Sequence, residues 1–228
     1  MTDSAFQTLE EAIADDHFPE VDLMLRRGRH IGRDDGTTYE YLVDAQAILE
    51  NFYRRFGCEL VQRSDGYFFL LPSGDRLGRR HLSPGEMLVG QTLALLYLDP
   101  ATLQHGGVVD KDMLLLRLSG LLGADVLVRT LNPRKRKYDE RVAEAMVRTQ
   151  VSEALRRLSD LGFVDLVDEA QLRLRPALMR FAEPVRALSE PSTALERLIA
   201  QGEVVLGDAP SEENNGDDDA ATDEEPSP

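Results

Sequence analysis

The chain has 228 residues, of which 42% are apolar and 29% are charged, and its formal net charge at pH 7 is -15. This composition is typical of a globular protein with one large or two small domains. No apolar run approaches the roughly 18 residues that span a bilayer. The first residues are acidic where a secretory signal is basic, so we expect a cytoplasmic protein that does not enter a membrane. The single cysteine, Cys58, excludes an internal disulfide and a thiolate-rich metal site.

The first part of the sequence predicts three helices followed by a β-hairpin. Apolar residues recur at helical spacing in "SAFQTLEEAIA", "FPEVDLMLRRG" and "YLVDAQAILENFYRRFG". The third of these helices directs seven side chains toward a core: Leu42, Val43, Ala45, Ile48, Leu49, Phe52 and Phe56. The stretch "CELVQRSDGYFFLLP" then holds two β-rich runs around Ser64-Asp65-Gly66, where Gly66 can supply the positive φ of a tight reversal.

The same order of elements recurs in the second part. Ser83, Pro84 and Glu86 form a capping box ahead of the apolar run "EMLVGQTLALLYL". A second helix follows Asp110 and breaks near Gly120 or Gly123, and the stretch "DERVAEAMVRTQVSEALRRLSDLG" gives a long third helix. Two alternating runs in "FVDLVDEAQLRLRP" then predict another hairpin.

Three helices and a hairpin form the order of a winged-helix domain, and here that order appears twice. We therefore expect a mainly α fold with small β-hairpins (α+β), built from two tandem winged-helix domains over residues 1–75 and 82–175. Residues 176–206 predict C-terminal helices. Residues 207–228 predict a disordered tail, because they hold nine acidic residues and no Lys or Arg. This tail is either a solvated extension or an electrostatic competitor for a basic surface.

Motifs of catalysis are missing from the sequence. The four histidines are far apart and none has a partner at metal-binding i, i+4 spacing. No phosphate-binding Gly-Lys-Ser/Thr loop and no nucleophile elbow is present. We therefore expect a protein that is not an enzyme and that holds no cofactor and no metal.

A basic segment reverses the charge of this acidic chain. The sequence from Arg134 to Arg157 contains eight basic and four acidic residues. The candidate DNA-binding residues are Arg134, Lys135, Arg136, Lys137, Arg141, Arg148, Arg156 and Arg157. In a winged helix the third helix can face a nucleic-acid groove, which favours salt-sensitive and largely sequence-independent phosphate contacts here. The opposing interpretation is a solvated helix face with Glu144–Arg148 and Glu153–Arg157 ion pairs.

Three stretches together resemble one known family. They are "LRRGRHIG", "GYFFL" and "LYLDP", within a match that runs in order from Phe18 to Leu174. The sequence is similar to the MukE and MksE family of small subunits of bacterial MukBEF-type condensins. The resemblance implies a tandem winged-helix homodimer that binds the kleisin subunit, and through it the SMC ATPase, and that contacts DNA in the nucleoid. Arg156 and Arg157 stand where that family has basic residues, but Ser159 and Asp160 depart from the pattern.

The turn in "LRRGRHIG" has two interpretations. Its candidate residues are Arg27, Gly28, Arg29, His30 and Gly32. In one interpretation Arg26 and Arg27 complement the dipole of a helix that ends there, while Arg29 and His30 cap or pair locally. In the other, the turn shapes the first domain for dimer or kleisin contact. The alternative function for the whole chain is a winged-helix transcriptional regulator.

Overall fold

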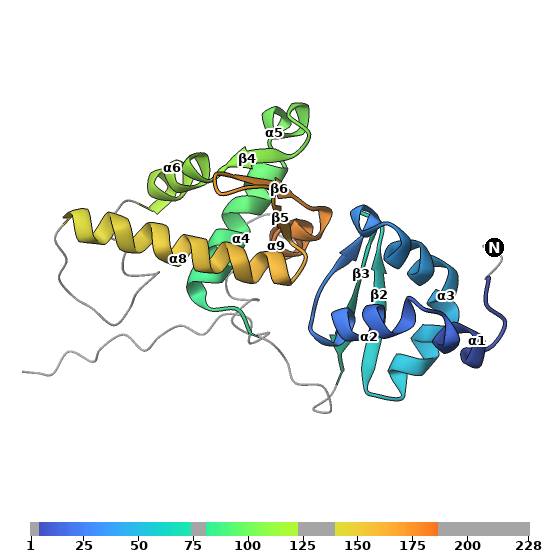
Figure 1. Ribbon diagram of the computed structural model, residues 1–228. Helices are drawn as coiled ribbons and strands as arrows, with labels where there is room; N and C mark the ends of the chain where they lie inside the picture. The colour runs from blue at the N-terminus through green and yellow to red at the C-terminus, as the bar shows by residue number, and fades with distance from the viewer. Residues whose placement is uncertain (1–4, 74–80, 123–139, 187–228) are drawn as a thin grey trace, which may run out of the picture.

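The structure is a computed structural model that describes residues 5–73, 81–122 and 140–186. Helices dominate it, and two small antiparallel sheets have three strands each (Figure 1). The predicted fold class, mainly α with small β elements, is thereby confirmed. The loop Arg134–Lys137, the second predicted C-terminal helix and the acidic tail lie outside the described residues.

The first half packs three helices beside a sheet with strand order β1-β3-β2. Its elements are α1 (Leu9–Ala14), α2 (Phe18–Arg26), β1 (Ile31–Gly32), the 3-10 turn η1 (Arg33–Asp35), α3 (Thr37–Arg54), β2 (Cys58–Arg63) and β3 (Tyr67–Pro72). The hairpin pairs Val61 with Phe69 and reverses at Gly66, whose φ is 85°. The predicted hairpin is confirmed.

The second half repeats a three-stranded sheet, with strand order β4-β6-β5. Its elements are α4 (Pro84–Tyr97), α5 (Pro100–Gln104), β4 (Val108–Asp110), α6 (Lys111–Leu122), α8 (Glu140–Asp160), β5 (Val164–Leu166), β6 (Gln171–Leu174), η2 (Pro176–Leu178) and α9 (Met179–Arg186). The Ser83 capping box opens α4 as expected, with the Ser83 side chain accepting from the Glu86 amide. The β5–β6 hairpin surrounds Glu169.

Strands β1 and β4 were not predicted from the sequence. Each is two or three residues long and pairs with the second strand of the neighbouring hairpin, Ile31 with Phe68 and Val109 with Leu172. Runs this short carry no alternation that a sequence pattern can reveal. Hairpins are therefore present at both positions where a wing is expected, while the tandem winged-helix assignment and its domain boundaries stay predictions.

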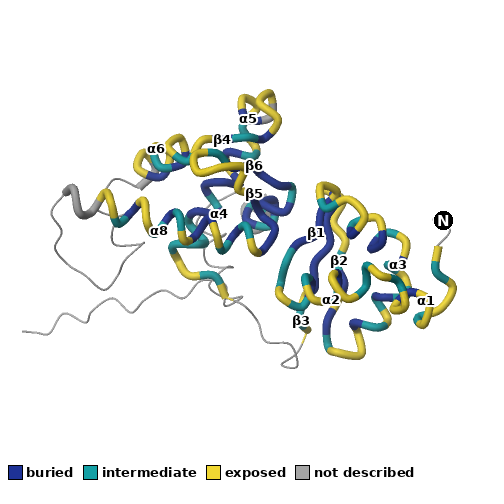
Figure 2. Tube along the Cα trace, viewed as in Figure 1, coloured by how far each residue is buried: buried dark blue, intermediate teal, exposed yellow. Residues whose placement is uncertain are grey.

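Strand β3 is buried on both faces. Because side chains alternate along a strand, Phe68 and Leu70 enter a core with α1, α2 and α3, whereas Tyr67 and Phe69 enter a second core with α4, α6 and α8. The four residues are at most 7% exposed. Figure 2 shows where the buried class lies along the chain. The position between two cores explains the apolar run "YFFL" of residues 67–70, whereas Leu71, the next residue, is 43% exposed.

The start of the predicted C-terminal helices packs into the second core. Turn η2 and helix α9 lie against α4, and Phe181 on α9 is 7% exposed. A Cβ added to Gly90 of α4 would lie 2.5 Å from the Phe181 ring. The described chain after residue 175 is therefore part of the second half.

One apolar side chain was placed wrongly from the sequence. Phe56 was expected in the first core, yet it follows the end of α3 at Arg54 and is 40% exposed. The Arg26 guanidinium lies over its ring, with the central carbon 4.6 Å from the ring centre. This cation–π contact is compatible with a position near the surface, where the Arg26 charge stays close to water.

Candidate functional site

Arg148 on α8 is an ion-paired residue. Its guanidinium lies 2.9 Å from the Asp112 carboxylate of α6 and 3.6 Å from the Glu144 carboxylate one turn earlier. The expected Glu144–Arg148 pair is therefore present. The hydrogen bond to Asp112 also raises the pKa of Arg148. Two carboxylates already compensate this charge, which leaves less of it for a phosphate.

Arg156 and Arg157 have a different environment near the end of α8. Arg156 is exposed and Arg157 is half-buried. The expected Glu153–Arg157 ion pair is absent from the described part of the chain, where Glu153 accepts a hydrogen bond from Gln150 at 3.0 Å. Neither arginine has an ion pair within the described part of the chain. These two cations are thus the best placed of the described candidates for a phosphate backbone.

The other basic candidates are not placed by the structure. Arg141 lies in the first turn of α8, but its side chain is not described, and Arg134–Lys137 fall between the described ranges. Their role in DNA contact stays a prediction.

A groove of about 520 Å³ separates α8 from the start of α6 and the β5–β6 turn. Its apolar floor includes Val151 and Leu155, and its rim carries charges of both signs. The full lining is Asp110, Lys111, Asp112, Met113, Leu115, Arg148, Val151, Ser152, Leu155, Glu169 and Ala170. Three carboxylates on this rim disfavour a phosphate, so an anionic backbone is better accommodated toward Arg156 than inside the groove.

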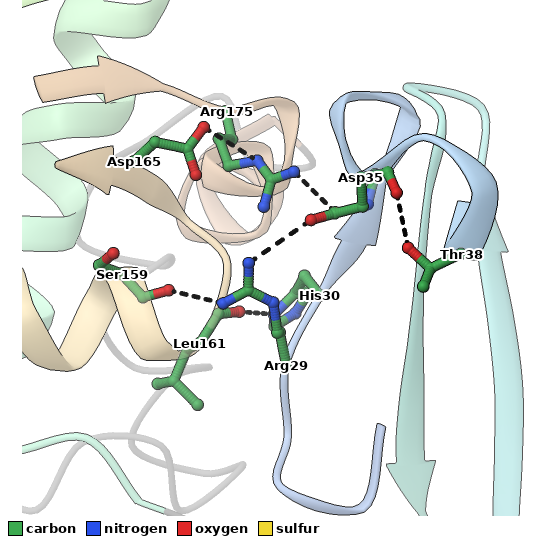
Figure 3. Close-up of polar contacts among 9 residues, drawn as sticks. Arg29, His30, Asp35, Thr38, Ser159, Leu161, Asp165 and Arg175 are labelled. Carbon is green, nitrogen blue, oxygen red and sulfur yellow. Dashed lines mark hydrogen bonds and ion pairs between the residues drawn. The ribbon is translucent and has the colours of Figure 1, made fainter. Parts of the chain in front are cut away.

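The turn after α2 forms a joint between the two halves of the chain (Figure 3). The backbone amide and the ring Nδ1 of His30 both donate to the Leu161 carbonyl just beyond α8, at 2.8 and 2.9 Å. Arg29 donates to the Ser159 carbonyl at 3.2 Å. The predicted local pairing is wrong for His30, whose side-chain hydrogen-bond partners are more than a hundred residues away. Arg29 pairs locally with Asp35, as expected, and also makes the distant contact with Ser159.

Asp35 is the acidic centre of this joint. Its carboxylate lies 2.6 Å from the Arg175 guanidinium, 3.4 Å from that of Arg29, and 2.8 Å from the Gly32 amide, which donates to it. Arg175 is only 2% exposed, and a second carboxylate, that of Asp165, lies 3.6 Å from its Nε. The ion pair between the halves is therefore largely removed from water, with side-chain exposures of 3% for Arg175 and 13% for Asp35, and the loss of either partner leaves the other poorly compensated.

His30 is a buried neutral histidine. Aromatic rings surround it, with centres 5.9 Å from its own for Tyr67, 5.3 Å for Phe69 and 4.4 Å for Phe163. Burial, together with the positive charge of Arg180, lowers the pKa of His30 to about 3. The Arg180 guanidinium donates to Nε2 at 2.9 Å, so the ring proton is on Nδ1 and points at Leu161.

Two of the candidate turn residues, Arg27 and Gly28, precede the joint. Arg27 is exposed at the end of α2, where its charge suits the helix dipole as expected, and Gly28 follows it. A role of the turn in dimer or kleisin contact stays a prediction. The sequence offered one signal of the joint, a histidine and an arginine followed by an acidic turn, but no indication of their distant partners.

Within the described ranges, no group of three or more His, Cys, Asp or Glu side chains could hold a metal ion. Among the same residues, no helix combines the length and the apolar character that a membrane span requires.

Comparison with known proteins gives one consistent family. Residues 6–227 match the sequence profile of the MukE-like family. The chain is 35% identical to "Chromosome partition protein MukE" of Histophilus somni (strain 2336) over 227 residues, which cover 95% of this chain and 90% of that protein. It is 36% identical to the protein of the same name from Escherichia coli (strain K12) over 200 residues, 86% of this chain and 85% of that protein.

Proposed function

The chain belongs to the MukE-like family, and on that premise we propose that it is a non-catalytic accessory subunit of a bacterial SMC complex that partitions chromosomes. The observation that carries the proposal is the similarity over nearly the whole length to relatives named as chromosome partition proteins. The absence of a catalytic motif from the sequence agrees with a role in binding rather than in catalysis.

We further propose that the protein acts as a homodimer that binds the kleisin subunit and, through it, the SMC ATPase. The first half is the candidate for protein association, because the exposed side of α3 mixes acidic and basic residues. Asp44, Asn51, Arg54 and Arg55 are exposed there. Such a mixed face is poorly suited to phosphates and well suited to another protein surface.

DNA contact is assigned in this proposal to the second half. Arg156 and Arg157 at the end of α8 are the described residues that support it, together with Arg141 and the basic stretch Arg134–Lys137. Contacts of these side chains to phosphates would be sequence-independent and weakened by salt, which suits a protein that works along the nucleoid.

Affinity purification of the tagged protein from its own cells, followed by mass spectrometry, tests the proposal. We expect recovery of a kleisin-type subunit and a long coiled-coil ATPase in constant ratio. Recovery of neither, from cells shown to express both, would overturn the assignment.

A footprinting experiment distinguishes the alternative, a winged-helix transcriptional regulator. An accessory subunit of an SMC complex gives weak protection that is spread over any sequence and disappears as salt rises. Protection of one defined sequence that persists at 200 mM salt would favour the regulator.

A further inference from the structure

The first half of the chain caps the last turn of α8 from outside. A helix leaves its last four carbonyls without partners in the helix. Here the Ser159 carbonyl accepts from the Gly162 amide at 2.9 Å and from Arg29 at 3.2 Å. Just beyond the helix, the Leu161 carbonyl accepts both hydrogen bonds from His30. The end of α8 is thus held by residues that precede β1.

Two other elements of the second half meet the same short segment. Arg175, at the end of β6, forms the buried ion pair with Asp35, and Arg180 on α9 donates to His30. Three separate elements, the end of α8, the end of β6 and α9, therefore converge on residues 29–35. Figure 3 shows the contacts made by the first two. Contacts at three points fix the relative rotation of two bodies, which a single point of contact does not.

The approach between the halves is backbone to backbone at Gly162. A Cβ at this position would lie 2.2 Å from the His30 carbonyl oxygen, so no side chain fits there. Its φ of 77° lies in the left-handed region that favours glycine. Glycine here permits both the turn that follows α8 and the contact with His30.

We propose that residues 29–35 are an orientation lock, which holds the first half against the end of α8 in one fixed orientation. The lock can open while the helices and strands of each half stay folded, although opening withdraws Tyr67 and Phe69 from the second core. The inference goes beyond the proposed function, since it concerns the coupling of the two halves whether or not either half binds a kleisin or DNA.

The buried ion pair favours two states of this lock, one closed and one fully open. With the joint closed, Arg175 has Asp35 as its nearest carboxylate and is 2% exposed. Small rotations would separate the charges without admitting water, which is costly, whereas full opening hydrates both. Intermediate orientations are therefore disfavoured, and packed interfaces of this kind switch between discrete arrangements.

Distance measurement between spin labels, on the full chain with Cys58→Ala, tests the lock. The labels go on Gln62→Cys in β2 and Arg117→Cys in α6, which are both exposed. We expect one narrow distance distribution for the otherwise unchanged protein, and a broadened or displaced one for Gly162→Ala.

Gly106→Ala is the matched control for this variant. Gly106 has a similar φ of 66°, but a Cβ there would meet nothing within 4 Å. Both variants carry the same backbone strain, and only one carries the clash with His30. A distribution for Gly162→Ala as narrow as that for Gly106→Ala, at the same mean distance, would overturn the lock.

Amide hydrogen exchange of Asp35→Asn serves if Gly162→Ala does not fold. We expect the His30 amide, which donates to Leu161, to exchange at least about tenfold faster than in the unchanged protein, while the Phe68 and Leu70 amides of β3 keep their rates. Arg27→Ala, an exposed change in the same turn, should leave all of these rates unaltered. Acceleration of all amides by one common factor would show that the halves separate only by global unfolding, and would exclude a lock that opens on its own.

Discussion

The carbonyl oxygen of Leu161 accepts two hydrogen bonds from one residue, His30, whose backbone amide and ring Nδ1 approach it to 2.8 and 2.9 Å. A carbonyl only accepts, so Nδ1 carries the proton. The Arg180 guanidinium only donates, so Nε2 must be unprotonated. One neutral tautomer of His30 satisfies both neighbours, and a protonated ring would face Arg180 with a second positive charge.

Acid should therefore destabilise the protein through His30. Its pKa is about 3 in the folded state, largely because of burial, against about 6.5 in an unfolded chain. Between these values the unfolded chain binds more protons, so this contribution to stability is complete above pH 6.5 and decreases as the pH falls toward 3. We expect the free energy of unfolding to lose up to about 1.4 kcal/mol per pH unit in this window. Urea unfolding at pH 7, 6 and 5 measures it.

His30→Asn supplies the comparison. Asparagine keeps a donor close to the position of Nδ1 but does not titrate in this range. We expect the variant to be less stable at pH 7 and its stability to depend less on pH between 7 and 5. Parallel stability curves for the two proteins would place the acid sensitivity elsewhere.

The Asp35–Arg175 pair should have a larger coupling energy in unfolding than an exposed ion pair at a similar distance. Asp35→Asn leaves the buried Arg175 with only the more distant and more exposed carboxylate of Asp165, 3.6 Å from its Nε, and we expect a cost of about 3 kcal/mol of unfolding free energy. The double variant Asp35→Asn, Arg175→Met should cost clearly less than the sum of the two single changes, by about 1–3 kcal/mol. Denaturant unfolding of the four proteins completes the cycle.

The exposed Asp112–Arg148 pair is the matched control for this cycle. The side chains are 80% and 55% exposed, and their 2.9 Å distance is similar to that of the buried pair. An exposed pair contributes little, so the coupling in the same cycle should stay below about 1 kcal/mol. Equal coupling energies for the two pairs would contradict the role assigned to burial.

The sequence predicted the elements of each half better than their relation to each other. The capping box at Ser83 and the reversal at Gly66 depend on neighbours within four residues, and the structure contains both. The joint depends on His30 and Leu161, which are 131 residues apart in the chain. No local pattern in a single sequence contains that information.

The burial of β3 shows the same limit. The run "YFFLL" predicted a strand of a hairpin, and such a strand needs only one buried face, so no sequence pattern indicated a second. Only the structure shows that Tyr67 and Phe69 belong to the core of the second half. Among the basic candidates, the sequence could not foresee that Arg148 faces Asp112 across two helices, because their separation in the chain is 36 residues.

Two helix glycines test the packing of α9 on α4. Gly90→Ala places a Cβ 2.5 Å from the Phe181 ring, which is itself held 4.8 Å from the Phe163 ring, and we expect a loss of about 1–3 kcal/mol in unfolding free energy. Gly120→Ala on α6 meets nothing within 4 Å and should gain about 0.5–1 kcal/mol from helix propensity. Addition of Phe181→Leu should recover part of the Gly90→Ala loss. A gain for both alanines would refute this packing of α9.

The proposed DNA surface predicts opposite effects for two changes on neighbouring helices. Arg156→Ala removes a cation without an ion pair in the described chain, so DNA affinity should fall, and its slope against log salt should shrink by about 0.9 for the lost phosphate contact. Asp112→Asn removes the nearer of the two carboxylates beside Arg148 and leaves Glu144 at 3.6 Å, so more of this positive charge is available to a phosphate, and affinity and slope should rise. Fluorescence anisotropy with one random-sequence duplex between 50 and 200 mM salt measures both, with Arg27→Ala as the control for an exposed charge outside α8. If Arg156→Ala and Arg27→Ala weaken binding equally, the effect is one of net charge, and the end of α8 is not the surface that contacts the phosphates.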